Sequence, residues 1–386
     1  MRTRPNATGL KISLIVMLLI GSLILSGCQT GTSTVPKGWS SGTLSDNSTL
    51  IIGSMQGKLV ALNIADGSQL WAVTLVAPEP AGNILGCSPG SSPKVAIYGS
   101  PAVDGDLVYV GGYDGRVYAI SSSTRLSKLK YLKKDANSPS RPIVGSPLVS
   151  QGAVYVASSD GLVYALDTIS LNERWQFETG GKIWSTPAIN GDTLYIGSFD
   201  KKFYAIDTAT GREKWRFPTG GAIVAAAAVD GNTVYFSSFD QHLYALDATD
   251  GHLKWKFPAS DRDTKPGNWF WAKPIVYNGL VYAACLDGKV YTLDAGSGAQ
   301  LGEFNLGSPV SSSPVLADKS IIVATQDGVL YSLETGNNQP KRLAELGESV
   351  AASLVAGQGK IYIHTLTDAV YEIDARSGAK RQFNIK

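Results

Sequence analysis

"FDKKFYAIDTATGREKW" runs from Phe199 to Trp215, and the chain repeats it almost unchanged as "FDQHLYALDATDGHLKW" from Phe239 to Trp255. Both copies alternate short runs of β-branched and aromatic residues with Asp and Gly, a pattern typical of antiparallel strands joined by tight turns. No stretch after Leu25 shows a sustained apolar period of 3.6 residues, so a helical repeat is excluded. The pair of copies therefore indicates a repeat architecture built from strands.

Eight copies of this unit follow the N-terminal segment. They are aligned at Ile51, Tyr109, Tyr155, Tyr195, Tyr235, Tyr282, Ile322 and Tyr362. The distances between successive starts are 58, 46, 40, 40, 47, 40 and 40 residues. A period near 40 with paired short strands is typical of a β-propeller. We therefore expect an all-β fold, an eight-bladed β-propeller of four-stranded antiparallel blades, over residues 38–386.

One unit predicts four strands, and the two ends of the repeat region predict how the ring closes. In the copy aligned at Tyr195, the expected strands are residues 182–189, 193–198, 202–207 and 213–217. The repeat region begins with "KGWSSGTL", which matches a first strand, and ends with "KRQFNIK", which matches a fourth. Each blade can therefore be built from contiguous sequence. A strand exchanged across the closure is the alternative, and it would need extra residues from 30–37.

Four tryptophans share one register, each shortly after the turn that ends the third strand. They are Trp71, Trp175, Trp215 and Trp255. We expect each ring to pack flat between neighbouring blades, with its N–H satisfied at the edge. The segments "YALDATDGHLKW" and "YAIDTATGREKW" resemble the tryptophan-docking repeat of the pyrroloquinoline-quinone-like (PQQ repeat) β-propellers. The resemblance covers the whole chain after its N-terminal segment, and eight repeats are usual in that family.

The N-terminal segment has the features of a targeting signal. "MRTRPNATGLK" is basic, residues 12–25 form an apolar run, and "LSGC" (Leu25–Cys28) resembles a bacterial lipobox. That resemblance implies a signal peptide over residues 1–27, diacylation (palmitate-type) of Cys28, and a tether over residues 28–37. An N-terminal anchor helix with an incidental cysteine is the alternative. In both cases the body is expected to be exported and held at a membrane, outside the cytoplasm.

A lipobox combined with this length resembles the lipoprotein branch typified by outer-membrane protein assembly factor B. The resemblance implies a non-catalytic scaffold, expected to be monomeric, that binds other proteins of the cell envelope. Without residues 1–27, the chain keeps 31 basic and 32 acidic residues, a formal net charge of −1. A nearly neutral body with no basic run argues against a nucleic-acid partner.

A quinone-dependent dehydrogenase of the same repeat family is the enzymatic alternative. Such enzymes need a catalytic Asp, Ca²⁺ ligands and usually a vicinal cysteine pair, and this chain has no Cys-Cys sequence. Asp residues recur at one register and are interpreted as turn formers: Asp160, Asp200, Asp240, Asp287 and Asp327. We therefore predict no catalytic residue, no metal site, and neither quinone nor calcium. Cys87 and Cys285 fall several blades apart and are expected to be free thiols.

A second group of aromatic residues marks a candidate binding patch. Trp39, Trp184 and Trp271 each lie three residues before the same first-strand position, and Tyr98 has that slot in the second copy. Trp269 lies two residues before Trp271, beside a longer connection. If the first strands line the axis, these side chains surround one mouth of a channel, where they could bind a protein, or carbohydrate or another ligand. The alternative is that they plug the channel or pack under the longer connection.

Overall fold

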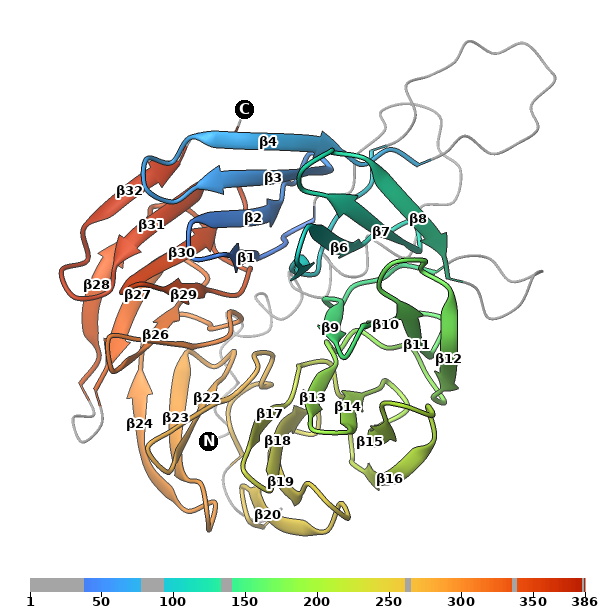
Figure 1. The fold of residues 1–386 in the computed structure, drawn as a ribbon. Coiled ribbons are helices and arrows are strands. Elements are labelled where there is room, and N and C mark those ends of the chain that lie inside the picture. Colours follow the sequence, from blue (N-terminus) through green and yellow to red (C-terminus); the bar gives the residue numbers. More distant parts are fainter. Residues whose placement is uncertain are drawn as a thin grey trace, which may run out of the picture. The chain divides into compact units, whose positions relative to one another are not determined.

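A computed structural model describes residues 38–77, 94–132, 141–260, 265–334, 339–383 and 385. In this part of the chain, 32 strands form eight antiparallel sheets of four, arranged as a ring (Figure 1). The predicted eight-bladed β-propeller is therefore confirmed. Within the same residues there is no helix of the length and apolarity that crossing a membrane would require. Cys28, Cys87 and the apolar run at residues 12–25 lie outside the described residues.

Each blade uses four consecutive strands. The first four blades are β1 (Gly42–Ser45), β2 (Thr49–Gly53), β3 (Lys58–Asn63), β4 (Gln69–Thr74); β5 (Ala102–Asp104), β6 (Leu107–Gly111), β7 (Arg116–Ser121), β8 (Ser127–Tyr131); β9 (Leu148–Ser150), β10 (Ala153–Ala157), β11 (Leu162–Asp167), β12 (Glu173–Glu178); and β13 (Ala188–Asn190), β14 (Thr193–Gly197), β15 (Lys202–Asp207), β16 (Glu213–Pro218). The last four are β17 (Ala228–Asp230), β18 (Thr233–Ser238), β19 (His242–Asp247), β20 (Leu253–Phe257); β21 (Ile275–Tyr277), β22 (Leu280–Ala284), β23 (Lys289–Asp294), β24 (Gln300–Asn305); β25 (Val315–Ala317), β26 (Ser320–Ala324), β27 (Val329–Leu333), β28 (Lys341–Glu345); and β29 (Val355–Gly357), β30 (Lys360–His364), β31 (Val370–Asp374), β32 (Lys380–Phe383). No strand of the described chain is exchanged between blades, as the contiguous arrangement predicts.

The prediction for the first strand of each blade is wrong in length. Residues 182–189 were expected to be a strand, but β13 pairs with β14 only over Ala188–Asn190. The preceding residues bond around the axis, to other blades: the Ser185 hydroxyl donates to the Ala225 carbonyl at 2.9 Å, and Thr186 Oγ1 accepts from the Ser146 N–H at 2.9 Å. Pro187 has no backbone N–H, so it cannot donate a hydrogen bond to a neighbouring strand. The first segments therefore join the blades together around the axis.

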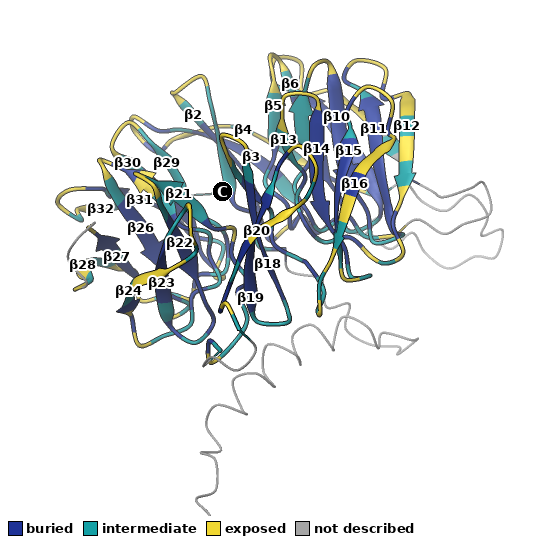
Figure 2. Cartoon of the chain, turned by 90° about the horizontal axis from the view of Figure 1, so that it is seen from below, coloured by how far each residue is buried: buried dark blue, intermediate teal, exposed yellow. Residues whose placement is uncertain are grey.

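The hydrophobic cores lie between blades. Eight clusters of buried residues each combine side chains from two neighbouring blades, and the eighth joins the last blade to the first. The second and third strands carry most of this burial, whereas the fourth strands are largely exposed at the rim (Figure 2). A blade removed from its neighbours would expose both faces, so the ring must close to be stable.

Docking tryptophans close three of the interfaces in the same way. Trp215 donates its indole N–H to the Ala248 carbonyl of the next blade at 3.2 Å, and the Tyr195 hydroxyl donates to the same oxygen at 3.0 Å. The Trp215 ring lies against Gly251, where a Cβ atom would come within 2.6 Å of it. Trp175 and Trp255 make equivalent bonds, to Thr208 and Ala295. Trp71 instead faces Arg125, whose guanidinium carbon lies 5.0 Å from the ring centroid.

Among the described residues, no tryptophan packs at the interface that closes the ring, and an arginine takes the place of the indole. Arg381 donates to the carbonyl oxygens of Ile64 at 2.5 Å and Ala65 at 2.8 Å, so it reaches the same turn that a docking indole reaches elsewhere. Phe383 takes the place of the ring and lies against Gly67. His364 adds a buried link, because its two ring nitrogens lie 2.8 Å from the Ser40 carbonyl oxygen and from an Asp368 carboxylate oxygen.

We predict that Gly251→Ala lowers the free energy of unfolding by about 1–3 kcal/mol more than Gly191→Ala, because only the first substitution overpacks a docking tryptophan. Both glycines have positive φ, +75° and +60°, but nothing lies within 4 Å of a Cβ at Gly191. The two variants therefore share the backbone strain and differ in the contact with Trp215. Urea unfolding measures this, and an equal loss of stability in both variants would show that the Trp215 ring does not restrict the residue at position 251.

We also predict that Arg381→Met lowers the free energy of unfolding by about 1–3 kcal/mol, because two carbonyl groups at the closure lose a charged donor. Arg376→Met is the matched control in the same blade. Its ion pair with Asp318 is on the surface, with the Arg376 side chain 80% exposed, and should change stability by less than about 1 kcal/mol. If the two variants unfold at the same urea concentration, Arg381 does not secure the closure.

Candidate functional site

The first segments of the eight blades surround a central cavity of about 1120 Å³. The four aromatic residues that share one register line it: Trp39, Tyr98, Trp184 and Trp271. The other four blades place smaller side chains in the same slot, and these line the cavity too: Val144, Val224, Ser311 and Ala351. The aromatic slot therefore forms one layer of the channel wall.

This layer lies toward the end of the channel where the second and third strands of each blade are joined. The Phe199 N–H donates to the Lys182 carbonyl at 2.9 Å, so the turn after β14 lies beside the start of the first segment. Trp184 packs edge-on against Phe199, with ring centroids 4.7 Å apart. The turn at residues 190–191 lies at the opposite end of that segment. We call the first end the aromatic mouth.

Two further aromatic clusters stand at the aromatic mouth. Trp39 packs edge-on against Tyr98 at 4.7 Å. Phe239 stacks on Trp269 at 4.8 Å and lies 5.6 Å from Trp271, so it joins the two tryptophans. Trp269 is not part of the cavity wall and reaches the mouth only through Phe239. Apart from Tyr98, which is buried, these side chains are partly exposed.

Sequence reasoning missed the partners of these tryptophans. Phe199 and Phe239 directly precede a recurrent Asp, so the signal was present in the repeat alignment.

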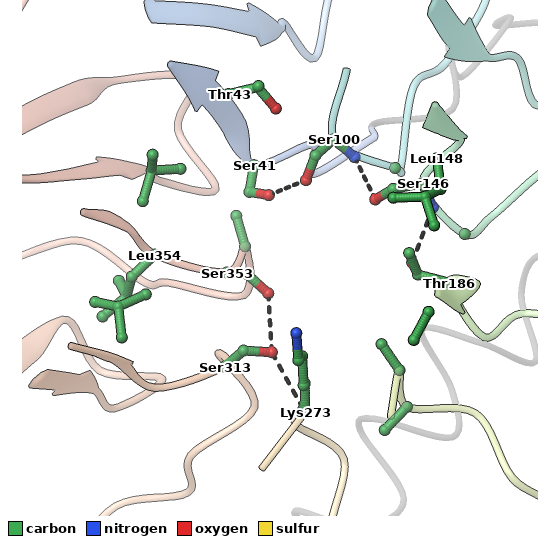
Figure 3. Close-up of a pocket in the computed structure, with 18 of the residues that line it drawn as sticks. Ser41, Thr43, Ser100, Ser146, Leu148, Thr186, Lys273, Ser313, Ser353 and Leu354 are labelled. Atoms are coloured by element: carbon green, nitrogen blue, oxygen red, sulfur yellow. Dashed lines mark hydrogen bonds between the residues drawn. The ribbon is translucent and has the colours of Figure 1, made fainter. Parts of the chain in front are cut away.

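Sequence reasoning also missed a second layer of the wall, two residues after the aromatic slot in each copy. That layer consists of Ser41, Ser100, Ser146, Thr186, Ala226, Lys273, Ser313 and Ser353. All of them except Ala226 are labelled in Figure 3. Comparison of that column across the eight copies would have revealed it.

The recurrent aspartates are held in turns away from the cavity wall. Asp200 accepts a hydrogen bond from the Tyr204 hydroxyl at 2.5 Å and another from the Lys202 N–H at 3.0 Å. Burial, together with the neighbouring carboxylate, raises the pKa of Tyr204, so the phenol remains a donor. Equivalent tyrosine bonds are made to Asp160, Asp240 and Asp287. These carboxylates therefore fasten the third strand of a blade to its turn.

The wall of the channel bears on the enzymatic alternative, a quinone-dependent dehydrogenase that binds calcium. Among the described residues that line it there is no carboxylate to ligate Ca²⁺ or to act as a base. In the same described ranges, no three His, Cys, Asp or Glu side chains form a metal-binding group. No step of quinone chemistry is therefore assigned to these residues.

Cys285 is buried and has the geometry of a packing residue. Its thiol lies 3.3 Å from the Asn268 carbonyl oxygen and 3.4 Å from that of Trp269, which it can reach as a donor. Burial, chiefly, raises the pKa of the Cys285 thiol far above its usual range. The nucleophilic thiolate is thus scarce at neutral pH.

A family model and solved structures relate the chain to known proteins. A family model described as "Outer membrane protein assembly factor BamB" matches residues 24–128, 88–183 and 172–383. Among solved structures, BamB from Moraxella catarrhalis is 20% identical, with a TM-score of 0.70, over 89% of this chain and 98% of that one. The computationally designed Ika8 protein is 15% identical, with a TM-score of 0.67, over 91% of this chain and 97% of its own. No curated protein matches the sequence.

We predict that Cys285 resists alkylation by iodoacetamide at neutral pH until the ring unfolds, because it is both buried and protonated. Mass spectrometry of the digested protein, with and without urea, checks this and separates Cys285 from Cys87 by peptide. Rapid labelling of Cys285 in the native protein would show that the thiol is accessible.

Proposed function

The chain belongs to the family described as outer membrane protein assembly factor BamB, and from this premise we propose that it is a non-catalytic scaffold for other proteins of the cell envelope. The observation that carries the proposal is the aromatic mouth. It presents three aromatic clusters on a closed ring, while the recurrent carboxylates are committed to turns.

The aromatic mouth has the chemistry of a protein-binding surface. Trp and Tyr are enriched among the residues that dominate binding energy, since they bury a large apolar area with few rotatable bonds. Here each tryptophan is held by a second ring, as Trp271 and Trp269 are by Phe239. Side chains ordered before binding lose little entropy when a partner docks, which favours affinity.

The outer rim supports a monomeric ring. A fourth strand has a free edge, and an exposed apolar edge would pair with another molecule. In β16 the exposed positions are held mostly by charged residues such as Glu213, Lys214 and Arg216, and β4, β20 and β24 each expose a single leucine. Charged edges of this kind discourage strand pairing between copies, so we propose that partners bind at the aromatic mouth rather than at the rim.

The same proposal includes the position of the protein in the cell. Export and diacylation of Cys28 would hold the ring at a membrane surface, on the side away from the cytoplasm. The lipid would restrict the scaffold to the membrane where its partners are assembled, which raises their effective concentration.

We predict that Trp271→Ala lowers recovery of envelope proteins with the purified scaffold at least tenfold, because aromatic anchors of an interface commonly contribute about 2 kcal/mol or more. Chemical crosslinking in cells, followed by quantitative mass spectrometry of the captured proteins, measures this.

Ile169→Ala is the matched control. Ile169 is 70% exposed and lies in a turn between third and fourth strands, at the end of the ring opposite the aromatic mouth. Its loss should leave recovery unchanged. Undiminished capture by the Trp271 variant, with the fold intact by circular dichroism, would exclude the aromatic mouth as the docking surface.

A further inference from the structure

Lys273 stands in the second layer of the channel wall. It is the only charged residue among the described residues that line the cavity. Figure 3 shows its side chain projecting into the opening, with serine and threonine side chains around it. Six of the eight positions in this layer carry hydroxyl groups. The other two positions are held by Lys273 and Ala226.

Within the described part of the chain, no acidic side chain faces the Lys273 ammonium group. Within the described residues, no hydrogen bond or ion pair of its Nζ atom is formed, and the side chain is open to the cavity. The surrounding wall removes part of its hydration, which lowers the pKa of Lys273 below its usual value. A partly desolvated positive charge is costly, and an anion in the cavity would offset that cost.

The hydroxyl groups of this layer accept hydrogen bonds from the wall of the channel. Ser146 Oγ accepts the N–H of Ser100 at 2.8 Å, and Thr186 Oγ1 accepts the N–H of Ser146 at 2.9 Å. Ser313 Oγ accepts the Lys273 N–H at 3.2 Å and the Ser353 hydroxyl at 3.2 Å. Within the described residues, the hydroxyl groups of Ser146, Thr186 and Ser313 donate no hydrogen bond, so their protons can turn to a ligand.

We propose that the channel is a binding site for a carboxylate, held by Lys273 and the neighbouring hydroxyl groups, on a ligand that enters through the aromatic mouth. A single ammonium matches a single carboxylate and repels a cation, and no described residue of the wall carries a carboxylate to offset that repulsion. Trp271 precedes Lys273 by two residues, so an apolar part of the ligand can contact the aromatic layer. The cavity exceeds the roughly 300–1,000 Å³ of ordinary ligand pockets. This inference goes beyond the scaffold role and does not depend on it.

The test is calorimetric titration of the full ring at low salt with two acids and their amides. The probes are 3-phenylpropionate and 3-phenylpropionamide, and acetyl-Gly-Phe with a free or an amidated carboxyl terminus. At least one acid should bind, with its amide at least tenfold weaker. Lys273→Met should weaken the acid at least tenfold, and Lys273→Arg should retain most of the binding. Lys341→Met is the charge-matched control, since Lys341 is exposed on the outer strand β28.

The outcomes separate the sources of the carboxylate. Similar affinity for both acids would assign the site to small organic acids, and markedly tighter binding of the peptide acid would assign it to a polypeptide terminus. Ser313→Ala, with an unchanged urea midpoint, should weaken the acid severalfold, because the Ser313 hydroxyl lies beside Lys273, and it keeps the test valid if Lys273→Met does not fold. No binding of either acid to the unmodified protein, equal binding of acid and amide, or unchanged binding by folded Lys273→Met would overturn the proposal.

Discussion

Every hydrophobic core described in this ring is shared by two blades, and the rest of the structure depends on that constraint. A four-stranded sheet buried on both faces cannot be stable alone, so closure is a condition of folding. This explains why the repeated residues are those at the interfaces: the tyrosine and tryptophan that converge on one carbonyl, and the glycine beneath the indole. These residues recur because successive blades meet at equivalent interfaces.

The closure solves that problem with different residues. Arg381 reaches the turn at Ile64 and Ala65, Phe383 covers Gly67, and His364 links Ser40 to Asp368. A junction between the two ends of a chain cannot rely on sequence continuity, so long polar side chains that cross the interface are well suited to it. Departures from the repeat are therefore of two kinds. Some complete the ring, and others, such as Trp271 and Lys273, face the channel and are free to serve binding.

Sequence alone predicted the architecture because the interface residues recur at a fixed spacing. The third strand of the fourth blade, β15, was placed correctly at residues 202–207, since its alternation is unbroken. The first strand was predicted too long because the apolar pattern of residues 182–189 cannot show that Ser185 and Thr186 bond to other blades.

Four aromatic residues of the predicted patch meet at the cavity. Trp269 joins them only through Phe239, a contact between blades that no spacing along the chain reveals. Lys273 was overlooked because a single lysine stands out only when the equivalent positions of the eight copies are aligned and compared.

The central claim is that this closed ring presents its aromatic mouth to envelope proteins. Site-specific photocrosslinking in living cells tests it most directly, with a photoreactive amino acid placed at Ala351 in the aromatic slot, or at Ala209 in an exposed turn at the opposite end. We expect covalent adducts with envelope proteins from Ala351 and none from Ala209. Adducts from Ala209 alone, or the absence of adducts from Ala351 in a folded and exported protein, would contradict the account.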